Sequence, residues 1–338
     1  MINRVLIVGL GSIGKRHLRI ARMLLPNADI RILRHQTNTT KDSPENSNGC
    51  FYNIKEAADF LPQLAVIANP APFHIDIANV LAEIGTHILI EKPLSTSLNG
   101  IKELIETCKK KNIVLLIGYN LRFSLSLKHF RGLLEKGIIG NVLSVRCEVG
   151  QYLPTWRAEL DYRKSVSANR KLGGGVLFEL SHEIDYLNWI FGNIEWAQAK
   201  LSHQSGLEID VEDSAHIIFG FVPKANDHQI IGTANLDFIR HDATRICIAI
   251  GENGSLRWNG LTGEVSIYEP RVKKWVDVYS HQDQRDDTYL AEWENFIACI
   301  IGNETPLVSG KDGLKVLQII ESIKLSTLSN GQKSIVSG

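Results

Sequence analysis

Three glycines near the N-terminus have the spacing of a phosphate-binding turn. Gly9, Gly11 and Gly14 form a G-x-G-x-x-G pattern directly after Val5–Val8, an apolar segment typical of strands that are buried on both faces. In this pattern the first glycine allows a tight turn, the second lets a pyrophosphate approach the backbone, and the third lets the next helix pack closely on the strand. These residues could therefore hold the phosphates of a dinucleotide.

An amphipathic run from Ile13 to Leu25, which Pro26 ends, follows the glycines and predicts a helix. The N–H groups of a first helical turn attract anions. A strand, a glycine turn and a helix in this order are the context that the fingerprint requires. We therefore predict a dinucleotide-binding site at Gly9, Gly11, Ser12, Ile13 and Gly14.

The next predicted strand, Ala28–Leu33, ends where such folds meet the adenosine ribose. An acidic residue at this point would bind the ribose 2′-hydroxyl, but this chain has Arg34 and His35. This pair favours a 2′-phosphate, so we expect NADP(H) to be preferred and NAD(H) to be accepted. The alternative is an exposed arginine at the end of a strand.

Further buried strands are predicted at Leu64–Ala68, His87–Ile90 and Val114–Ile117. Because the carboxyl ends of parallel strands share one rim of a sheet, ligands bind there. That rim would carry these further cofactor contacts: Asn69, Pro70, His74, Glu91, Lys92 and Asn120.

Two of these rim residues have distinctive settings. Lys92 lies between a buried strand and Pro93, so its backbone is restricted and its amine can be aimed with little loss of entropy. His74 lies near the start of a predicted helix, Phe73–Ile84, where it could contact the cofactor or only cap the helix.

Strands that alternate with helices at this spacing predict a right-handed, doubly wound parallel sheet, a Rossmann fold, over residues 1–122. Residues 123–338 instead show β-branched, partly alternating segments joined by hairpin turns. The strands predicted there are Val142–Val149, Trp196–His203, Asp213–Phe221, Ile230–Phe238, Thr244–Gly251, Ser255–Trp258 and Glu264–Glu269. The expected fold class is therefore α/β followed by α+β, with a large, open, mostly antiparallel sheet in the second domain. The terminal helices, Thr288–Ile301 and Gly313–Leu328, are expected to pack back across the domains.

One helix, Val176–Phe191, is predicted to interrupt the second sheet, and the glycine triplet Gly173–Gly175 precedes it. A glycine triplet lets the backbone come close to another molecule, to which a rigid helix could present His182. A buried structural histidine is the alternative. Four side chains of one helical face recur at intervals of three or four residues: Glu179, His182, Glu183 and Tyr186.

The composition bears on partners and location. The chain has 338 residues, long enough for two domains, and its 37 Lys and Arg residues equal its 37 Asp and Glu residues, so no net charge draws it to nucleic acid or to a membrane. No apolar run reaches the length of a membrane span, and no signal peptide is expected because the N-terminus leads directly into a strand. The five cysteines are dispersed without metal-ligand spacing, which favours reduced thiols, a cytoplasmic location and no bound metal.

Taken together, the motifs resemble those of the Gfo/Idh/MocA oxidoreductases, the family of glucose–fructose oxidoreductase and inositol dehydrogenase. The resemblance covers nearly the whole chain and rests on residues 8–17, 69–70, 91–93 and 173–185. It implies an NAD(P)-binding α/β domain followed by an α/β domain with a large open sheet. It also implies that Lys92 orients the substrate hydroxyl and the nicotinamide, and that His182 acts as the acid or base.

Two features near these motifs concern the substrate. Many relatives have an aspartate where this chain has Glu179, but only two residues separate Glu179 from His182, one fewer than usual, so the role of that aspartate does not transfer directly. Residues 152–163 look like a branch of the family associated with bacterial surface-sugar biosynthesis, and their arginines and aromatics could bind anionic groups and a sugar face. The alternative is a basic, solvated loop. The candidate substrate contacts are Asn120, Trp156, Arg157, Tyr162, Arg163 and Glu179.

The expected function is hydride transfer between a nicotinamide and a secondary alcohol or ketone of a cyclic sugar, sugar acid or nucleotide sugar. Lys92 and His182 are the expected catalytic residues, and a homodimer or homotetramer is expected. Two enzyme alternatives are a cyclitol dehydrogenase and an epimerase or eliminase that retains its cofactor. A non-catalytic NAD(P)-binding sensor or co-repressor is a further alternative, although the presence of Lys92 and His182 favours an enzyme.

Overall fold

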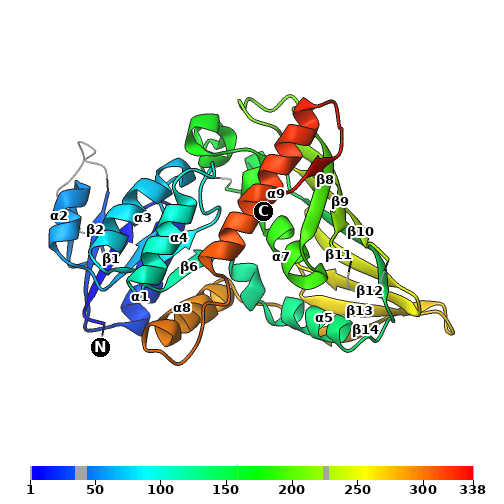
Figure 1. Cartoon of the computed structure of the whole chain (residues 1–338), viewed down its shortest axis with the longest axis horizontal. Coiled ribbons are helices and arrows are strands. Elements are labelled where there is room, and N and C mark those ends of the chain that lie inside the picture. Colours follow the sequence, from blue (N-terminus) through cyan, green and yellow to red (C-terminus); the bar gives the residue numbers. More distant parts are fainter. Residues whose placement is uncertain (1, 35–43, 158, 224–227, 338) are drawn as a thin grey trace. The chain divides into compact units, whose positions relative to one another are not determined.

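The computed structural model describes residues 2–34, 44–157, 159–223 and 228–337, and the chain divides into two compact units (Figure 1). Unit 1 comprises Met1–Tyr119 and Tyr289–Leu317, and unit 2 comprises Asn120–Thr288 and Gln318–Gly338. The sequence places the boundary after residue 122. The first segment of unit 1 ends three residues earlier, and unit 1 also takes in a segment from near the C-terminus.

Unit 1 contains a parallel six-stranded sheet in the order β3-β2-β1-β4-β5-β6, which confirms the predicted doubly wound topology. The chain crosses over between the neighbouring strands β1 and β4, and ligands bind at the rim of such a switch point. The short strand β3 was not predicted. The strands are β1 (Arg4–Val8), β2 (Asp29–Leu33), β3 (Gly49–Phe51), β4 (Leu64–Ile67), β5 (His87–Glu91) and β6 (Leu115–Gly118).

The helices of unit 1 bury their apolar sides against this sheet. The hydrophobic core contains Val5 and Ile7 of β1 together with Trp293 and Phe296, all 0% exposed. Residues far apart in the sequence therefore form one core. The helices are α1 (Ser12–Leu24), α2 (Ile54–Asp59), the short η1 (Ala71–Phe73), α3 (His74–Glu83), α4 (Ile101–Lys110) and, from Tyr289 onward, α8 (Asp287–Ile300).

Unit 2 contains a nine-stranded sheet in the order β14-β13-β12-β11-β7-β10-β9-β8-β15. β7 and β10 are parallel and the other neighbours are antiparallel, which confirms a mostly antiparallel sheet. The edge strands β14 and β15 were not predicted. The strands are β7 (Val142–Gly150), β8 (Ile194–Ser202), β9 (Ser214–Phe221), β10 (Ile231–Asp237), β11 (Thr244–Gly251), β12 (Gly254–Asn259), β13 (Glu264–Glu269), β14 (Lys274–Ser280) and β15 (Ser334–Ile335).

Alternation along β7 distinguishes the two faces of this sheet. Cys147 and Val149 are buried, whereas Arg146 and Glu148 between and beside them are exposed. Successive side chains of a strand point to opposite faces, so one face is covered and the other is open.

No helix in the described part of the chain is long and apolar enough to cross a membrane.

The helix predicted over residues 176–191 is in fact two helices, α6 (Val176–Glu179) and α7 (His182–Phe191). Leu180 has φ −99° and ψ 26°, outside the α-helical region, and this ends α6. The prediction of one continuous helix is therefore wrong. The other helical elements of unit 2 are η2 (Asn120–Phe123), α5 (Leu125–Glu135), η3 (Leu153–Thr155), η4 (Tyr162–Lys164), η5 (Val166–Ala168), η6 (Arg170–Leu172) and, from Gln318 onward, α9 (Gly310–Leu328).

Candidate functional site

The glycine turn of unit 1 joins β1 to α1 beside the end of β4. Gly9 has φ +88°, and a Cβ atom added to it would lie 2.9 Å from the backbone oxygen of Ala68. A Cβ atom added to Gly14 would overlap the backbone oxygen of Gly9. Both positions therefore require glycine for the packing of the turn itself.

Gly11 differs from its two neighbours because it is exposed and a Cβ atom added to it would have nothing within 4 Å. It is the N-cap residue of α1, where no side chain caps the helix and the first turn has no acidic residue. Ser12 is exposed and Ile13 is half-buried. The start of α1 therefore offers backbone N–H groups and the positive end of a helix dipole to an anion.

Asn69 and Pro70 follow β4 at the same rim and are half-buried. The Oδ1 atom of Asn69 is buried, and no described residue donates a hydrogen bond to it. A buried acceptor without a partner carries a cost of about 1–3 kcal/mol, which a donor from a bound molecule would relieve.

His74 is 1% exposed and connects two rim segments. Its Nε2 lies 2.7 Å from the backbone oxygen of Asn69, and its Nδ1 lies 3.2 Å from that of Pro93. Burial lowers its pKa, which favours a neutral ring. Because α3 has no side-chain cap, the capping alternative is wrong, and a cofactor contact through either ring nitrogen would compete with a carbonyl group.

Arg34 follows β2 and is held in place through its backbone and its side chain. Its backbone N–H donates to the backbone oxygen of Phe51 at 3.1 Å, and its guanidinium lies 5.9 Å from the centre of the Tyr52 ring. A hydrogen bond with Tyr52 raises its pKa, so the positive charge persists. His35, the other predicted ribose contact, lies outside the described residues.

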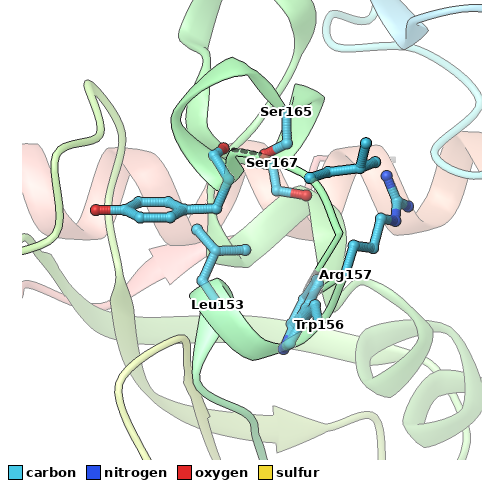
Figure 2. A pocket seen from close by; sticks show the side chains of 7 residues that line it. Leu153, Trp156, Arg157, Ser165 and Ser167 are labelled. Atoms are coloured by element: carbon cyan, nitrogen blue, oxygen red, sulfur yellow. Dashed lines mark hydrogen bonds between the residues drawn. The ribbon is translucent and has the colours of Figure 1, made fainter.

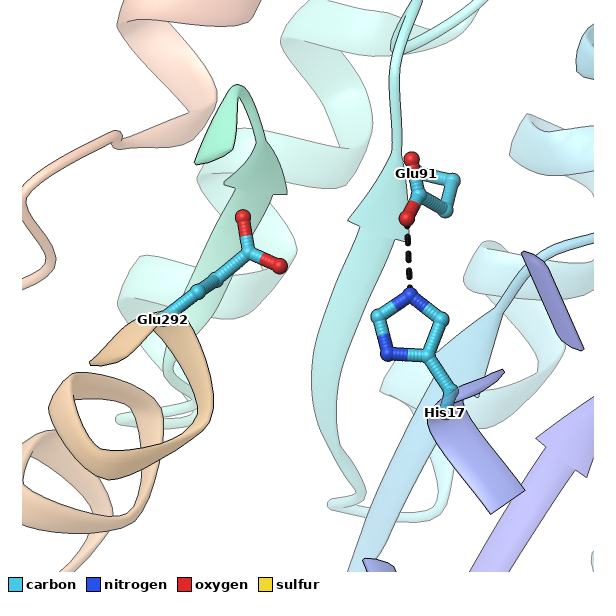
Figure 3. A group of neighbouring side chains, drawn as sticks. All are labelled: His17, Glu91 and Glu292. Atoms are coloured by element: carbon cyan, nitrogen blue, oxygen red, sulfur yellow. Dashed lines mark hydrogen bonds and ion pairs between the residues drawn. The ribbon is translucent and has the colours of Figure 1, made fainter. Parts of the chain in front are cut away.

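Lys92 directly follows Glu91, the last residue of β5. Its backbone N–H donates to Glu91 Oε2 at 3.1 Å, and its peptide bond to Pro93 is cis. Glu91 Oε1 lies 2.7 Å from Nε2 of His17 on α1, and Figure 3 shows these two side chains facing the carboxyl group of Glu292. Sequence reasoning assigned no role to His17 and did not single out Glu292. Glu292 lies on the same helical face as the apolar residues Tyr289, Trp293 and Phe296, and an acidic residue on such a face could have been noticed in the sequence.

In unit 2, His182 is the first residue of α7 and is half-buried. Three neighbouring side chains attach this helix to other elements. Asp185 accepts two hydrogen bonds from the buried Arg122 guanidinium, at 2.6 and 2.9 Å. Glu183 pairs with Arg245 at 2.8 Å, and the Tyr186 hydroxyl lies 3.1 Å from Cys147 Sγ. These pairs fix the helix that carries His182.

The four residues predicted to share one helical face do not all lie on one helix. Glu179 ends α6, a separate helix, and is half-buried. Glu183 and Tyr186 are both 0% exposed and are engaged in the pairs just described, so His182 alone of the predicted set is partly accessible on α7.

The glycine triplet before α6 packs against unit 2 itself. A Cβ atom on Gly174 would overlap the backbone of Val166, and one on Gly175, which has φ +109°, would overlap the carboxyl group of Glu212. Glu212 Oε1 also accepts a hydrogen bond from Leu177 N at 3.2 Å, and burial raises the pKa of Glu212. At Gly174 and Gly175 the missing side chains therefore serve the packing of the chain itself, and the expected approach of another molecule to the triplet stays a prediction.

The loop after β7 forms a pocket in unit 2 with about 270 Å³ of empty space, open to solvent (Figure 2). Trp156 is held by a hydrogen bond from its Nε1 to the backbone oxygen of Gln151 at 3.0 Å, and Arg157 is exposed. The pocket lining therefore combines an aromatic ring with a cation. Its residues are Leu153, Trp156, Arg157, Leu160, Tyr162, Ser165 and Ser167.

Three predicted substrate contacts do not line this pocket: Arg163, Asn120 and Glu179. Arg163 pairs with Asp161 at 2.8 Å and with Glu208 at 2.9 Å, so an incoming anion would compete with two carboxylates. Asn120 belongs to unit 2 and is buried, and its Nδ2 donates to Thr288 Oγ1 at 2.8 Å.

Comparison with known proteins identifies the family. Residues 3–119 match the model described as "Oxidoreductase family, NAD-binding Rossmann fold", and residues 131–333 match "Oxidoreductase family, C-terminal alpha/beta domain". The chain belongs to the Gfo/Idh/MocA oxidoreductase family. It is therefore an oxidoreductase with an NAD-binding domain.

Individual members of the Gfo/Idh/MocA family are similar over different shares of the chain. Myo-inositol 2-dehydrogenase of Thermotoga maritima is 22% identical over 96% of each chain. Levoglucosan dehydrogenase of Pseudarthrobacter phenanthrenivorans is 32% identical over 47% of this chain and 40% of that protein.

Solved structures of the family share the fold. A levoglucosan dehydrogenase in complex with NADH has a TM-score of 0.84 at 22% identity, covering 99% of each chain. The WlbA dehydrogenase from Bordetella pertussis, in complex with NADH and UDP-GlcNAcA, has a TM-score of 0.80 at 20% identity, covering 100% of each chain.

The residues of unit 1 fit the NAD(H) that this family binds. An open cradle at Gly11, an uncapped helix start and the unpartnered Oδ1 of Asn69 are features that a dinucleotide would satisfy. Lys92 follows the strand β5 at the rim of the same sheet.

Proposed function

We propose that this oxidoreductase transfers hydride between a nicotinamide dinucleotide and a secondary alcohol or ketone of a cyclic sugar, a sugar acid or a nucleotide sugar. The observation that carries the proposal is Lys92, which directly follows β5 at the rim of the nucleotide-binding sheet with its backbone held by Glu91. The names of the relatives, which refer to levoglucosan, inositol and UDP-GlcNAcA, support the substrate class.

The proposed substrate-binding surface in unit 2 is the pocket with Trp156 and Arg157. An aromatic ring can stack on the apolar face of a sugar, and a guanidinium can bind a carboxylate or a phosphate through two hydrogen bonds. We therefore favour a sugar acid or a nucleotide sugar over an uncharged sugar.

A bound nicotinamide would supply the hydride acceptor or donor. The ammonium group of Lys92 would bind the substrate oxygen and stabilise the negative charge that develops on it. His182 would take the hydroxyl proton during oxidation and return it during reduction. The pairs from Asp185 and Glu183 support this role because they hold α7, and hence the backbone of His182, in one place.

The roles of Lys92 and His182 can be tested by alanine substitution. His182→Ala should lower kcat by about 10²–10⁴-fold with NAD(H) affinity nearly unchanged, the range that positioned proton transfer supplies. Lys92→Ala should lower kcat and weaken substrate binding together. Levoglucosan, myo-inositol and UDP-GlcNAcA would serve as substrates, and the exposed His216 and Lys102 provide the control variants His216→Ala and Lys102→Ala. Wild-type turnover in His182→Ala would contradict the assignment.

We further propose that NADP(H) binds more tightly than NAD(H). The charged Arg34 at the end of β2 supports this preference, because a guanidinium can bind a ribose 2′-phosphate that an acidic residue would repel. Arg34→Asp should reverse the preference, since a charge-assisted hydrogen bond of about 1.5–3 kcal/mol is replaced by repulsion. Calorimetric titration of the wild type and of Arg34→Asp with NADP(H) and NAD(H) measures the preference. Equal affinities of the wild type for the two cofactors would contradict the proposal.

A cyclitol dehydrogenase is the second candidate. The similarity to myo-inositol 2-dehydrogenase over 96% of each chain favours it. Turnover of myo-inositol that is unaffected by Arg157→Ala, together with no turnover of UDP-GlcNAcA, would support this candidate over a charged sugar.

Assembly and location are also proposed. Apolar side chains on the sheet of unit 2, including Ile218, Trp275 and Val276, are 37–40% exposed, which supports a homodimer or homotetramer. The cysteines of the described chain are free thiols, which supports a cytoplasmic location. Light scattering during size-exclusion chromatography would measure the assembly.

A further inference from the structure

Trp293, His17 and Glu91 form a buried hydrogen-bond network in unit 1. The chemistry of these groups determines which atom donates and which accepts in each hydrogen bond. The indole Nε1–H of Trp293 lies 2.9 Å from His17 Nδ1, and an indole can only donate. His17 Nδ1 must therefore accept, so the proton of the neutral ring is on Nε2. That N–H group donates to Glu91 Oε1 at 2.7 Å.

Glu91 transmits this arrangement to Lys92. Its Oε1 accepts from His17, and its Oε2 accepts from the backbone N–H of Lys92 at 3.1 Å. Both contacts are acceptor contacts, as suits an ionised carboxylate. His17, Trp293 and Glu91 are at most 6% exposed, so the carboxylate is shielded from water and its orientation depends on these donors.

Glu292 is the remaining member of the group. It is 0% exposed, and neither of its carboxyl oxygens has a hydrogen-bond partner among the described residues. Ligand atoms of His17, Glu91 and Glu292 lie within 4.8 Å of one another, and Figure 3 shows the Glu292 carboxyl group turned toward the other two.

A metal ion would suit two carboxylates and an imidazole, but the tautomer of His17 argues against it. Its Nε2 carries a proton and its Nδ1 accepts from Trp293, so neither ring nitrogen has a lone pair to offer to a metal. A proton on Glu292 is the simpler way to avoid two adjacent negative charges in a buried site.

We propose that His17 and Trp293 are positioning residues that hold Lys92 through the carboxylate of Glu91, and that Glu292 is kept protonated so that this carboxylate is the single negative charge of the group. The inference rests on the proposed catalytic role of Lys92. Burial, and then the charge of Glu91, raise the pKa of Glu292 well above its usual value. Tyr289 is a further ionisable group that interacts with Glu292, and the Arg16 guanidinium lies 4.5 Å from the centre of the Tyr289 ring.

The first experiment compares Trp293→Phe, His17→Leu and His17→Gln with the wild type, using the full chain. Trp293→Phe removes the donor to His17, His17→Leu removes the donor to Glu91, and His17→Gln restores an N–H group. Amide exchange of Lys92, followed by NMR, should be faster in the first two variants and should return toward the wild-type rate in the third. The kcat of Trp293→Phe and of His17→Leu should fall by about 10–100-fold at unchanged NADH affinity, because a small misplacement of a reacting group has such an effect.

Phe296→Leu provides the matched control because Phe296 shares the core with Trp293 but takes no part in the network. It should lower thermal stability without changing the exchange of the Lys92 amide. Wild-type exchange and wild-type kcat in folded His17→Leu would overturn the proposal. If exchange changes as expected while Lys92→Ala has wild-type turnover, the proposed function fails and the positioning network remains.

The second experiment concerns the proton on Glu292. The infrared spectrum of the wild type minus that of Glu292→Gln should contain the carbonyl band of a protonated carboxyl group at neutral pH, and Glu292→Gln should keep the Lys92 exchange rate and kcat within about twofold of wild type. An ionised carboxylate band, or one equivalent of a divalent metal that Glu292→Gln loses, would overturn the assignment of the proton.

Discussion

At the scale of single residues, Gly11 and Gly14 belong to one motif but serve different purposes. Nothing lies within 4 Å of a Cβ atom added to Gly11, whereas one added to Gly14 would meet the backbone of Gly9. The space beside Gly11 is therefore available to a ligand, and the space beside Gly14 is filled by the protein. A side chain at Gly11 should therefore affect ligand binding, and a side chain at Gly14 should affect folding.

The first prediction follows from this contrast. Gly11→Val should leave the free energy of unfolding nearly unchanged and should abolish NADH binding, because the side chain fills the space of the pyrophosphate. Gly14→Ala should lower the free energy of unfolding by about 1–3 kcal/mol, the usual cost of overpacking. Urea unfolding and NADH titration of both variants measure these effects. Wild-type NADH affinity in Gly11→Val would show that the motif is only a turn.

A second prediction at this scale concerns pH. Because Glu292 has a raised pKa in the folded state, that state retains a proton which the unfolded chain, with a pKa near 4.5, releases. The free energy of unfolding should therefore fall as pH rises from about 4.5 toward the raised pKa, by up to about 1.4 kcal/mol per pH unit. Glu292→Gln cannot ionise and should flatten this slope.

Glu294→Gln is the control for the pH series, because Glu294 is an exposed residue of the same helix. It should keep the wild-type slope. Urea unfolding at a series of pH values provides the measurement, and an identical slope in Glu292→Gln would mean that Glu292 does not titrate in this way.

At the scale of elements, the buried pair of Asp185 and Arg122 connects α7 to η2. Both side chains are at most 2% exposed. Asp185→Asn preserves the shape but leaves the guanidinium charge uncompensated, so it should lower the free energy of unfolding by about 3–5 kcal/mol. Glu135→Gln, in the exposed pair of Arg131 and Glu135 on α5, should cost less than about 0.5 kcal/mol. Chemical unfolding compares them, and similar losses in both variants would contradict the proposed importance of burial.

Periodicity predicted most strands of both sheets and most helices within a few residues, because apolar spacing reflects which face of an element is buried. β14 escaped prediction because Trp275, Val276 and Val278 are all exposed, so it lacks the alternation of a half-buried strand. The break at Leu180 was also not predicted, since Leu is a good helix former and neither Gly nor Pro marks the end of α6 in the sequence.

Local features of the candidate site could be predicted from the sequence, but contacts between distant residues could not. The glycine spacing and the position of Lys92 after a strand are local and could be read from the sequence. The pairs of His17 with Glu91, and of Gly175 with Glu212, join residues 74 and 37 positions apart, so no local pattern contains them. The same limit applies to Trp293, because helical spacing indicates an apolar face but not the sheet on which it packs.

At the scale of the whole molecule, unit 1 is discontinuous in sequence. Trp293 and Phe296 are 0% exposed in the core that also contains Val5 and Leu64. Removing one such aromatic side chain typically costs about 3–5 kcal/mol, which is comparable with the whole stability of many domains. Residues 1–119 alone lack both aromatics.

The last prediction is that residues 1–119 do not fold stably by themselves, whereas the same residues joined through a flexible linker to residues 287–317 do. The linked form restores Trp293 and Phe296 to the core and should unfold cooperatively and bind NADH, because the glycine turn and the rim residues Asn69 and Lys92 all belong to unit 1. A linked form with Trp293→Ala and Phe296→Ala is the control and should resemble the short fragment. Circular dichroism during heating and NADH titration would compare the three proteins. Cooperative unfolding and NADH binding by residues 1–119 alone would show that the segment near the C-terminus is an addition to a domain that is already complete.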